Sequence, residues 1–137
     1  MKAIFFAAME AKMPEIVDVP ERENGVLDFA WMEEKIGHGC RCLDSALRLV
    51  DGKEYRFWVD DEGAFNARPT AYGGDDSVLF GNLFIFGKED MCGELTEVTE
   101  QDLEHIKQFI GPRYNILMLW NLSFPNYTKW DFRVVEK

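Results

Sequence analysis

The sequence predicts an α+β fold, with a mixed or antiparallel sheet and two helices in a single compact domain. Two segments repeat apolar residues at helical spacing, a hairpin signal joins two alternating segments, and one run of nine residues is apolar on both faces. These features follow one another as strand, helix, hairpin, strand, helix and further strands. No internal repeat or low-complexity linker divides the 137 residues, so one core is expected.

Two strands and a helix are expected in the first forty residues. The segment from Lys2 to Met9 predicts a buried strand, and Glu15 to Val19 alternates between two prolines as an edge strand does. From Val26 to Ile36, apolar residues recur at helical spacing with acidic residues opposite. Gly37 is expected to end this helix.

The segment from Cys40 to Val50 fits both a helix and a strand, and the residues after it decide between them. Asp51-Gly52 is a strong signal for a type I′ turn. Glu54 to Val59 then alternates, with Tyr55 and Phe57 on one face. We therefore expect a β-hairpin around Asp51-Gly52.

The second half of the chain begins with its most apolar segment. Val78 to Phe86 is apolar on both faces, which predicts a central strand covered on both sides. Asn82 would lie in the middle of this strand and satisfy a local backbone group. Thr99 and Asp102 come close to a capping box, so a second helix is expected from Thr99 to Ile110.

Residues 112–137 differ from the rest of the chain in charge. They predict two further strands, Tyr114 to Leu122 and Trp130 to Val135, in an aromatic extension packed on the domain of residues 1–111. The extension has four basic and two acidic residues, a net charge of +2, whereas residues 1–111 carry −12. Aromatic residues among basic ones can stack single-stranded bases, but at strand spacing they more often complete a core or an interface. A homodimer through this segment is therefore one expectation.

The whole chain is acidic, with 15 Lys and Arg against 25 Asp and Glu and a formal net charge of −10. Binding to nucleic acid or to anionic lipid depends on Lys and Arg, so we expect neither direct nucleic-acid contact nor membrane association. No apolar run reaches the ~18 residues that span a bilayer. An odd number of cysteines argues against a disulfide framework and favours a reducing cytoplasm.

Candidate metal ligands and nucleophiles occur in one alternating group, His38, Cys40 and Cys42, which Cys92 or His105 could complete. Their single-residue spacing differs from the pairs of cysteines that structural zinc sites use, so no metal site is expected. Catalysis by a Cys-His pair stays open, because a sequence does not show the required geometry. The chain has no P-loop, dinucleotide fingerprint or nucleophile elbow. We expect a protein without cofactor and without enzymatic activity.

An acidic segment lies between Lys88 and Lys107, which enclose no other Lys or Arg. Unrelieved negative charge fits a positively charged partner, although the solvated side of an amphipathic helix produces the same pattern. The residues expected to bind a partner are Glu89, Asp90, Glu94, Glu97, Glu100, Asp102 and Glu104.

Three stretches, followed by an entry to a helix, resemble a family of small proteins from phages, plasmids and other mobile elements. They are Val59-Asp60-Asp61-Glu62-Gly63, Asn66-Ala67-Arg68-Pro69-Thr70-Ala71 and Leu79-Phe80-Gly81-Asn82-Leu83-Phe84-Ile85-Phe86-Gly87, and the entry is Gly93-Glu94-Leu95-Thr96. Over roughly residues 14–111 the chain is similar to domain-of-unknown-function family 3846. The resemblance implies an origin in a mobile element and carries over no active site.

Acidity, missing catalytic motifs and this resemblance lead to a functional expectation. The chain is expected to be a non-enzymatic binding protein that occupies a basic surface of a host protein, as an anti-defence or DNA-mimicking inhibitor would. The alternative is a small-ligand or nucleotide-binding module with a pocket near Asn66, Arg68 and Asn82. Arg68 would contact an anionic ligand there, because it is the only basic residue between Arg56 and Lys88.

Overall fold

A computed structural model describes the chain except residues 11, 64–68, 73–77, 111–113, 125–126 and 137, with side chains described in residues 1–7, 9–10, 12–63 and 81–108. Its centre is a five-stranded antiparallel sheet with the strand order β2-β1-β7-β4-β3. The strands of this sheet are β1 (Lys2–Phe6), β2 (Glu15–Asp18), β3 (Leu43–Val50), β4 (Lys53–Asp60) and β7 (Leu83–Gly87). The predicted α+β class is confirmed.

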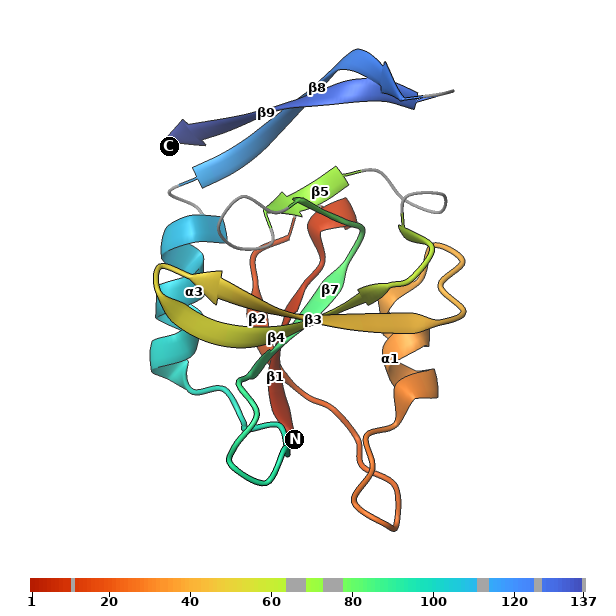
Figure 1. Ribbon diagram of the computed structural model, residues 1–137, viewed down its shortest axis with the longest axis vertical. Coiled ribbons are helices and arrows are strands. Elements are labelled where there is room, and N and C mark those ends of the chain that lie inside the picture. Colours follow the sequence, from red (N-terminus) through yellow and green to blue (C-terminus); the bar gives the residue numbers. More distant parts are fainter. Residues whose placement is uncertain (11, 64–68, 73–77, 111–113, 125–126, 137) are drawn as a thin grey trace.

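Two helices lie on opposite sides of this sheet and form three layers with it (Figure 1). On one face, α3 (Glu100–Ile110) packs Leu103 and Ile106 against the sheet. On the other face, α1 (Phe29–Ile36) packs Met32 against phenylalanines of β1 and β7. The sheet therefore has a hydrophobic core on each side.

The central strand β7 is buried at every position, which confirms a strand covered on both faces for Leu83–Gly87. The prediction of one continuous strand from Val78 to Phe86 is wrong. Val78–Phe80 forms β6, which pairs with β5 (Pro69–Tyr72) in a separate ladder. Gly81 has φ 81°, and Asn82 lies in the turn between β6 and β7 instead of mid-strand. A positive φ interrupts an extended strand, and glycine adopts it without steric cost.

The first strand is also shorter than the predicted segment from Lys2 to Met9, because β1 ends at Phe6. The chain then enters a short 3₁₀ turn, η1 (Ala8–Glu10). There the Met9 N–H donates to the side-chain oxygen of Asn82 at 2.8 Å instead of to a neighbouring strand. A side chain distant in the sequence thus ends the first strand.

Helix α1 begins at Phe29, three residues later than predicted, because Asp28 is its N-cap. The Asp28 carboxylate accepts a hydrogen bond from the Trp31 N–H at 3.1 Å, which satisfies one of the free donors of the first turn. Val26 precedes the helix and is exposed. Gly37 ends the helix as predicted, with φ 68°.

The hairpin of β3 and β4 is confirmed, with Asp51 at φ 48° and Gly52 at φ 79°. Two positive φ values define a type I′ turn, whose twist matches that of the paired strands. The register places Val50 opposite Lys53 and continues to Leu43 opposite Asp60. β3 lies at the edge of the sheet.

The second helix and the two last strands are confirmed as elements. Thr99 caps α3: its hydroxyl accepts from the Asp102 N–H at 3.2 Å, while the Asp102 carboxylate accepts from the Thr99 N–H at 2.8 Å. β8 (Tyr114–Phe124) and β9 (Tyr127–Glu136) pair with each other in a separate antiparallel ladder, and their register shifts once between Trp120 and Leu122.

None of the helices in the described part of the chain combines the length and apolar character that crossing a bilayer requires.

Candidate functional site

Six of the seven acidic side chains that the sequence singled out are exposed. Four of them lie on the loop between β7 and α3, and two lie on α3 itself. The exposed residues are Glu89, Asp90, Glu94, Glu97, Glu100 and Glu104.

The loop between β7 and α3 is held in shape by its own acidic side chain. The Asp90 carboxylate accepts from the N–H groups of Cys92 (2.8 Å) and Glu94 (3.0 Å). Glu89 and Leu95 form an isolated antiparallel β-bridge between their backbones, which closes the loop. Asp90 therefore orders the backbone, and the Glu94 carboxylate is presented from a defined turn.

A second acidic loop, which the sequence analysis did not single out, lies at the same end of the molecule, where Figure 1 shows the loops before α1 and α3 beside the chain start. It contains the exposed Glu21 and Glu23 and follows directly on the exposed Asp18, the last residue of β2. β1 connects the two loops: Lys2 pairs in register with Asp18, and its N–H donates to the Glu97 carboxylate at 2.7 Å. Sequence reasoning missed this loop because about seventy residues separate it from Glu94.

We call the carboxylates of these two loops the acidic end: Asp18, Glu21, Glu23, Asp90, Glu94 and Glu97. The basic groups in the same segments are Lys2, Arg22, Lys88 and the amino group of Met1, which lies 3.7 Å from an Asp18 carboxylate oxygen and 3.6 Å from a Glu21 carboxylate oxygen. Arg22 lies 3.9 Å from Asp28, which is outside this set. The acidic end therefore keeps an excess of negative charge. A concentration of charge of one sign raises the local concentration of oppositely charged partners.

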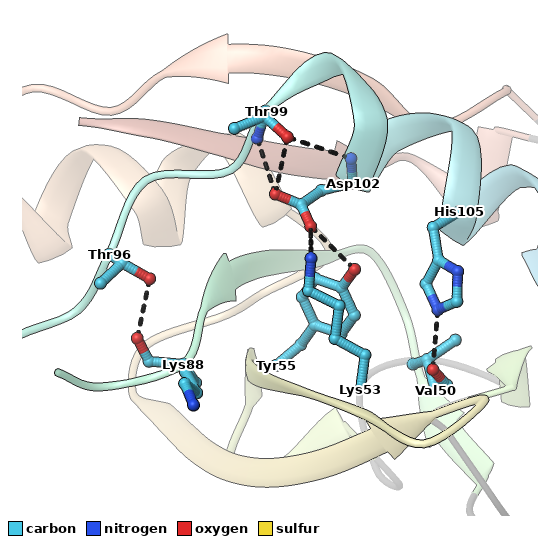
Figure 2. A network of polar contacts seen from close by, with 8 residues as sticks. All are labelled: Val50, Lys53, Tyr55, Lys88, Thr96, Thr99, Asp102 and His105. Atoms are coloured by element: carbon cyan, nitrogen blue, oxygen red, sulfur yellow. Dashed lines mark hydrogen bonds and ion pairs between the residues drawn. The ribbon is translucent and has the colours of Figure 1, made fainter.

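Asp102 was expected to face a partner, but the structure places it inside. Its side chain is 8% exposed. It accepts hydrogen bonds from the Lys53 ammonium at 2.5 Å and from the Tyr55 hydroxyl at 2.9 Å. Figure 2 shows this carboxylate between Thr99 on one side and the two residues of β4 on the other. Asp102 thus joins α3 to the β3–β4 hairpin and is no part of an exposed acidic surface.

These contacts determine the protonation of the buried pair. Burial alone would raise the pKa of Asp102, but the hydrogen bonds from Lys53, Thr99 and Tyr55 outweigh it, and the pKa lies below its ordinary 3.8. Burial and the adjacent carboxylate raise the pKa of the Tyr55 hydroxyl above its ordinary 10. Asp102 is therefore charged and Tyr55 neutral at physiological pH.

A cleft of about 530 Å³ opens beside this network. The end of the β3–β4 hairpin, the end of β7 and the segment before α3 line it, and both Lys53 and Lys88 contribute to the lining. Carboxylates of Glu54 and Glu97 lie among the same lining residues. The volume falls within the range of small-molecule sites.

Of the three residues expected around a ligand pocket, the structure describes Asn82. Asn82 is 2% exposed and both ends of its amide are bonded, one to the Met9 N–H and the other to the Ile36 carbonyl at 3.1 Å. Asn82 satisfies backbone groups as expected, but these groups belong to residues distant in the sequence and not to local ones. Asn66 and Arg68 lie outside the described residues.

The group of His38, Cys40 and Cys42 makes separate local contacts. His38 Nε2 lies 3.0 Å from a Glu10 carboxylate oxygen. Burial, together with the nearby Asp60 carboxylate, raises the pKa of the Cys40 thiol to about 12. A thiol with this pKa is a poor nucleophile at neutral pH. In residues with described placement, no three His, Cys, Asp or Glu side chains lie together as a metal site requires.

Comparison of the chain with known proteins finds no matching protein-family model, no matching curated protein and no matching solved structure. The resemblance to the mobile-element family stays a prediction.

Proposed function

We propose that this chain is a non-enzymatic binding protein whose acidic end occupies a basic surface on another protein. This proposal rests on one observation: two loops that are distant in the sequence bring six exposed carboxylates to one end of the molecule, where the same segments supply four basic groups. Glu100 extends this charge onto the exposed side of α3, whereas the Glu104 carboxylate lies 3.9 Å from the Lys107 ammonium. Such a surface increases the association rate with a basic partner and discriminates against acidic ones.

The sharpest form of this proposal is a phage or mobile-element inhibitor that imitates DNA. Its carboxylates would then take the place of phosphates on a nucleic-acid-binding host protein, such as a defence protein. Proteins that neutralise phosphates lose affinity steeply with salt, and complexes formed through the acidic end would do the same. The proposal places the chain in a reducing cytoplasm, where Cys40, Cys42 and Cys92 stay free, as they are in the structure.

The first test is affinity capture from bacterial lysate at low and high salt, with mass spectrometry of the retained proteins. Three baits are compared. The first is the unchanged chain, and the second carries Glu→Gln changes at Glu94, Glu97, Glu100 and Glu104. The third, a control of equal charge, carries Glu→Gln changes away from the acidic end, at Glu10, Glu15, Glu34 and Glu62.

The expected result is a basic protein that the unchanged chain and the control retain at low salt and lose at high salt. The variant at the acidic end should not retain it. Equal retention by all three baits would show that the acidic end is not the contact. Duplex DNA tests the narrower form, because it should displace the captured partner if the two occupy the same site.

The cleft of about 530 Å³ beside Lys53 and Lys88 supports a second candidate function, binding of a small ligand. Thermal shifts with a nucleotide panel test it, because a ligand that binds only the folded chain raises its melting temperature. A shift in melting temperature that is lost on Lys88→Ala would support binding in the cleft. A shift lost on Arg68→Ala would instead support the pocket expected near Arg68, and no shift with any nucleotide would count against both.

A further inference from the structure

The outer edge of β3 presents backbone groups that no described strand pairs with. Val50 and Lys53 flank a two-residue turn, so the even-numbered residues of β3 hydrogen-bond to β4 and the odd-numbered ones face outward. Two contacts agree with this: the Ser45 N–H is held by the Asp44 carboxylate at 2.9 Å, and the Leu47 carbonyl accepts from Arg48 Nη1 at 3.2 Å. In the described backbone no strand pairs with this edge.

The same strand exposes large apolar side chains. Leu47 is 43% exposed and Leu49 is 44% exposed, and both lie on the α1 side of the sheet. An eight-residue edge strand with exposed leucines is a template for pairing with another strand. The Nε of Arg48 is buried and has no hydrogen-bond partner among the described residues, so this N–H still needs an acceptor.

We propose that β3 pairs with β3 of a second copy of this chain, antiparallel about a two-fold axis at Ala46. The two five-stranded sheets then become one continuous sheet. A two-fold axis perpendicular to a sheet places residues of the same parity opposite each other. The outward-facing odd residues of one strand therefore meet the odd residues of the other, as hydrogen bonding between them requires.

Charge complementarity selects this register. With the axis at Ala46, Asp44 lies opposite the partner's Arg48, and the symmetry repeats this pair. Leu43 lies opposite the partner's Leu49 in the same register. These charged positions are non-hydrogen-bonded pairs, where opposite side chains are closest.

The neighbouring symmetric register, with the axis at Leu47, loses this complementarity. It places Asp44 opposite the partner's Val50 and Arg48 opposite the partner's Ala46. In the register at Ala46, Asp44 and Arg48 pair with each other across the axis. They then no longer bond the Ser45 N–H and the Leu47 carbonyl of their own strand. The backbone groups they leave are then bonded by the second strand.

Two single charge reversals test the proposal by sedimentation velocity. Asp44→Arg places like charges opposite each other twice in a homodimer, and so does Arg48→Asp. Each should raise the dimer dissociation constant at least tenfold, because like charges directly opposite destabilise a strand pair. Matched controls are Glu34→Arg and Arg22→Asp, which make the same charge changes on exposed side chains away from the β3 edge.

The decisive measurement mixes the two single variants. One Asp44→Arg chain and one Arg48→Asp chain form complementary pairs at both positions, so the equimolar mixture should dimerise although neither variant does alone. The double variant should dimerise by itself. An unchanged chain that stays monomeric at submillimolar concentration would overturn the proposal. So would single variants that dimerise like the unchanged chain, which would move the contact elsewhere, for example to β8 and β9, or a mixture that stays monomeric.

Discussion

Replacing Asp102 by alanine removes a buried carboxylate that holds α3 to the β3–β4 hairpin. The Tyr55 hydroxyl, on a fully buried residue, loses its acceptor, at a cost of about 1–3 kcal/mol. Loss of the reciprocal cap with Thr99 costs about 0.5–2 kcal/mol. Lys53 is 58% exposed, so its released ammonium regains water and adds little. The free energy of unfolding should fall by about 2–4 kcal/mol.

The effect of Asp102→Ala should depend on pH. Because the folded pKa of Asp102 lies below its ordinary 3.8, its contribution is fully present above the unfolded value. It is lost as the pH falls from about 3.8 through the folded pKa. The difference in stability between the two chains should therefore be largest near neutral pH and should shrink in strong acid.

Urea unfolding followed by circular dichroism, from neutral pH to pH values below 3.8, measures this difference. The control Glu100→Gln removes an exposed carboxylate from the first turn of the same helix and should change stability by less than about 0.5 kcal/mol. If Asp102→Ala unfolded at the same urea concentration as the unchanged chain, Asp102 would not join the helix to the hairpin. A difference that did not vary with pH would contradict the assigned charge state.

Three further substitutions or modifications have defined outcomes. Asn82→Ala leaves two backbone groups without their side-chain partner and should cost about 2–4 kcal/mol in urea unfolding; a neutral effect would contradict the bonding of the turn. Gly87→Ala should cost about 1–3 kcal/mol, because a Cβ would lie 2.9 Å from the Thr96 carbonyl oxygen, and full stability would mean that this segment shifts freely. Iodoacetamide at pH 8 should label Cys42 before Cys40, whose pKa is about 12, and mass spectrometry of the peptides measures the order. In urea, Cys40 should become as reactive as Cys42. Equal labelling rates in the folded chain would contradict the burial of Cys40.

Local signals in the sequence predicted several elements correctly. The Asp51-Gly52 turn requires two positive φ values, which these residue types adopt. Thr99 capped α3 as expected, because a capping interaction involves residues three apart. The class of the fold followed from the order of these elements.

The acidic charge was equally readable from the sequence, but the fate of each carboxylate was not. Asp102 and Glu100 look alike in the sequence and occupy the same helical turn. One is buried against Lys53 and Tyr55, and the other is exposed. Only the packing of α3 on β4, residues about fifty positions away, separates them.

The composition, the turns and the helix caps of this protein are properties of neighbouring residues, and the sequence by itself determined them. Tertiary structure decided where the strands end, because Asn82 bonds Met9 and Ile36 across the fold. It also brought Asp18 and Glu94 to one end and, among the described strands, left the outer edge of β3 without a partner strand. These features depend on contacts between distant segments, which form only when the sheet and its two helices assemble.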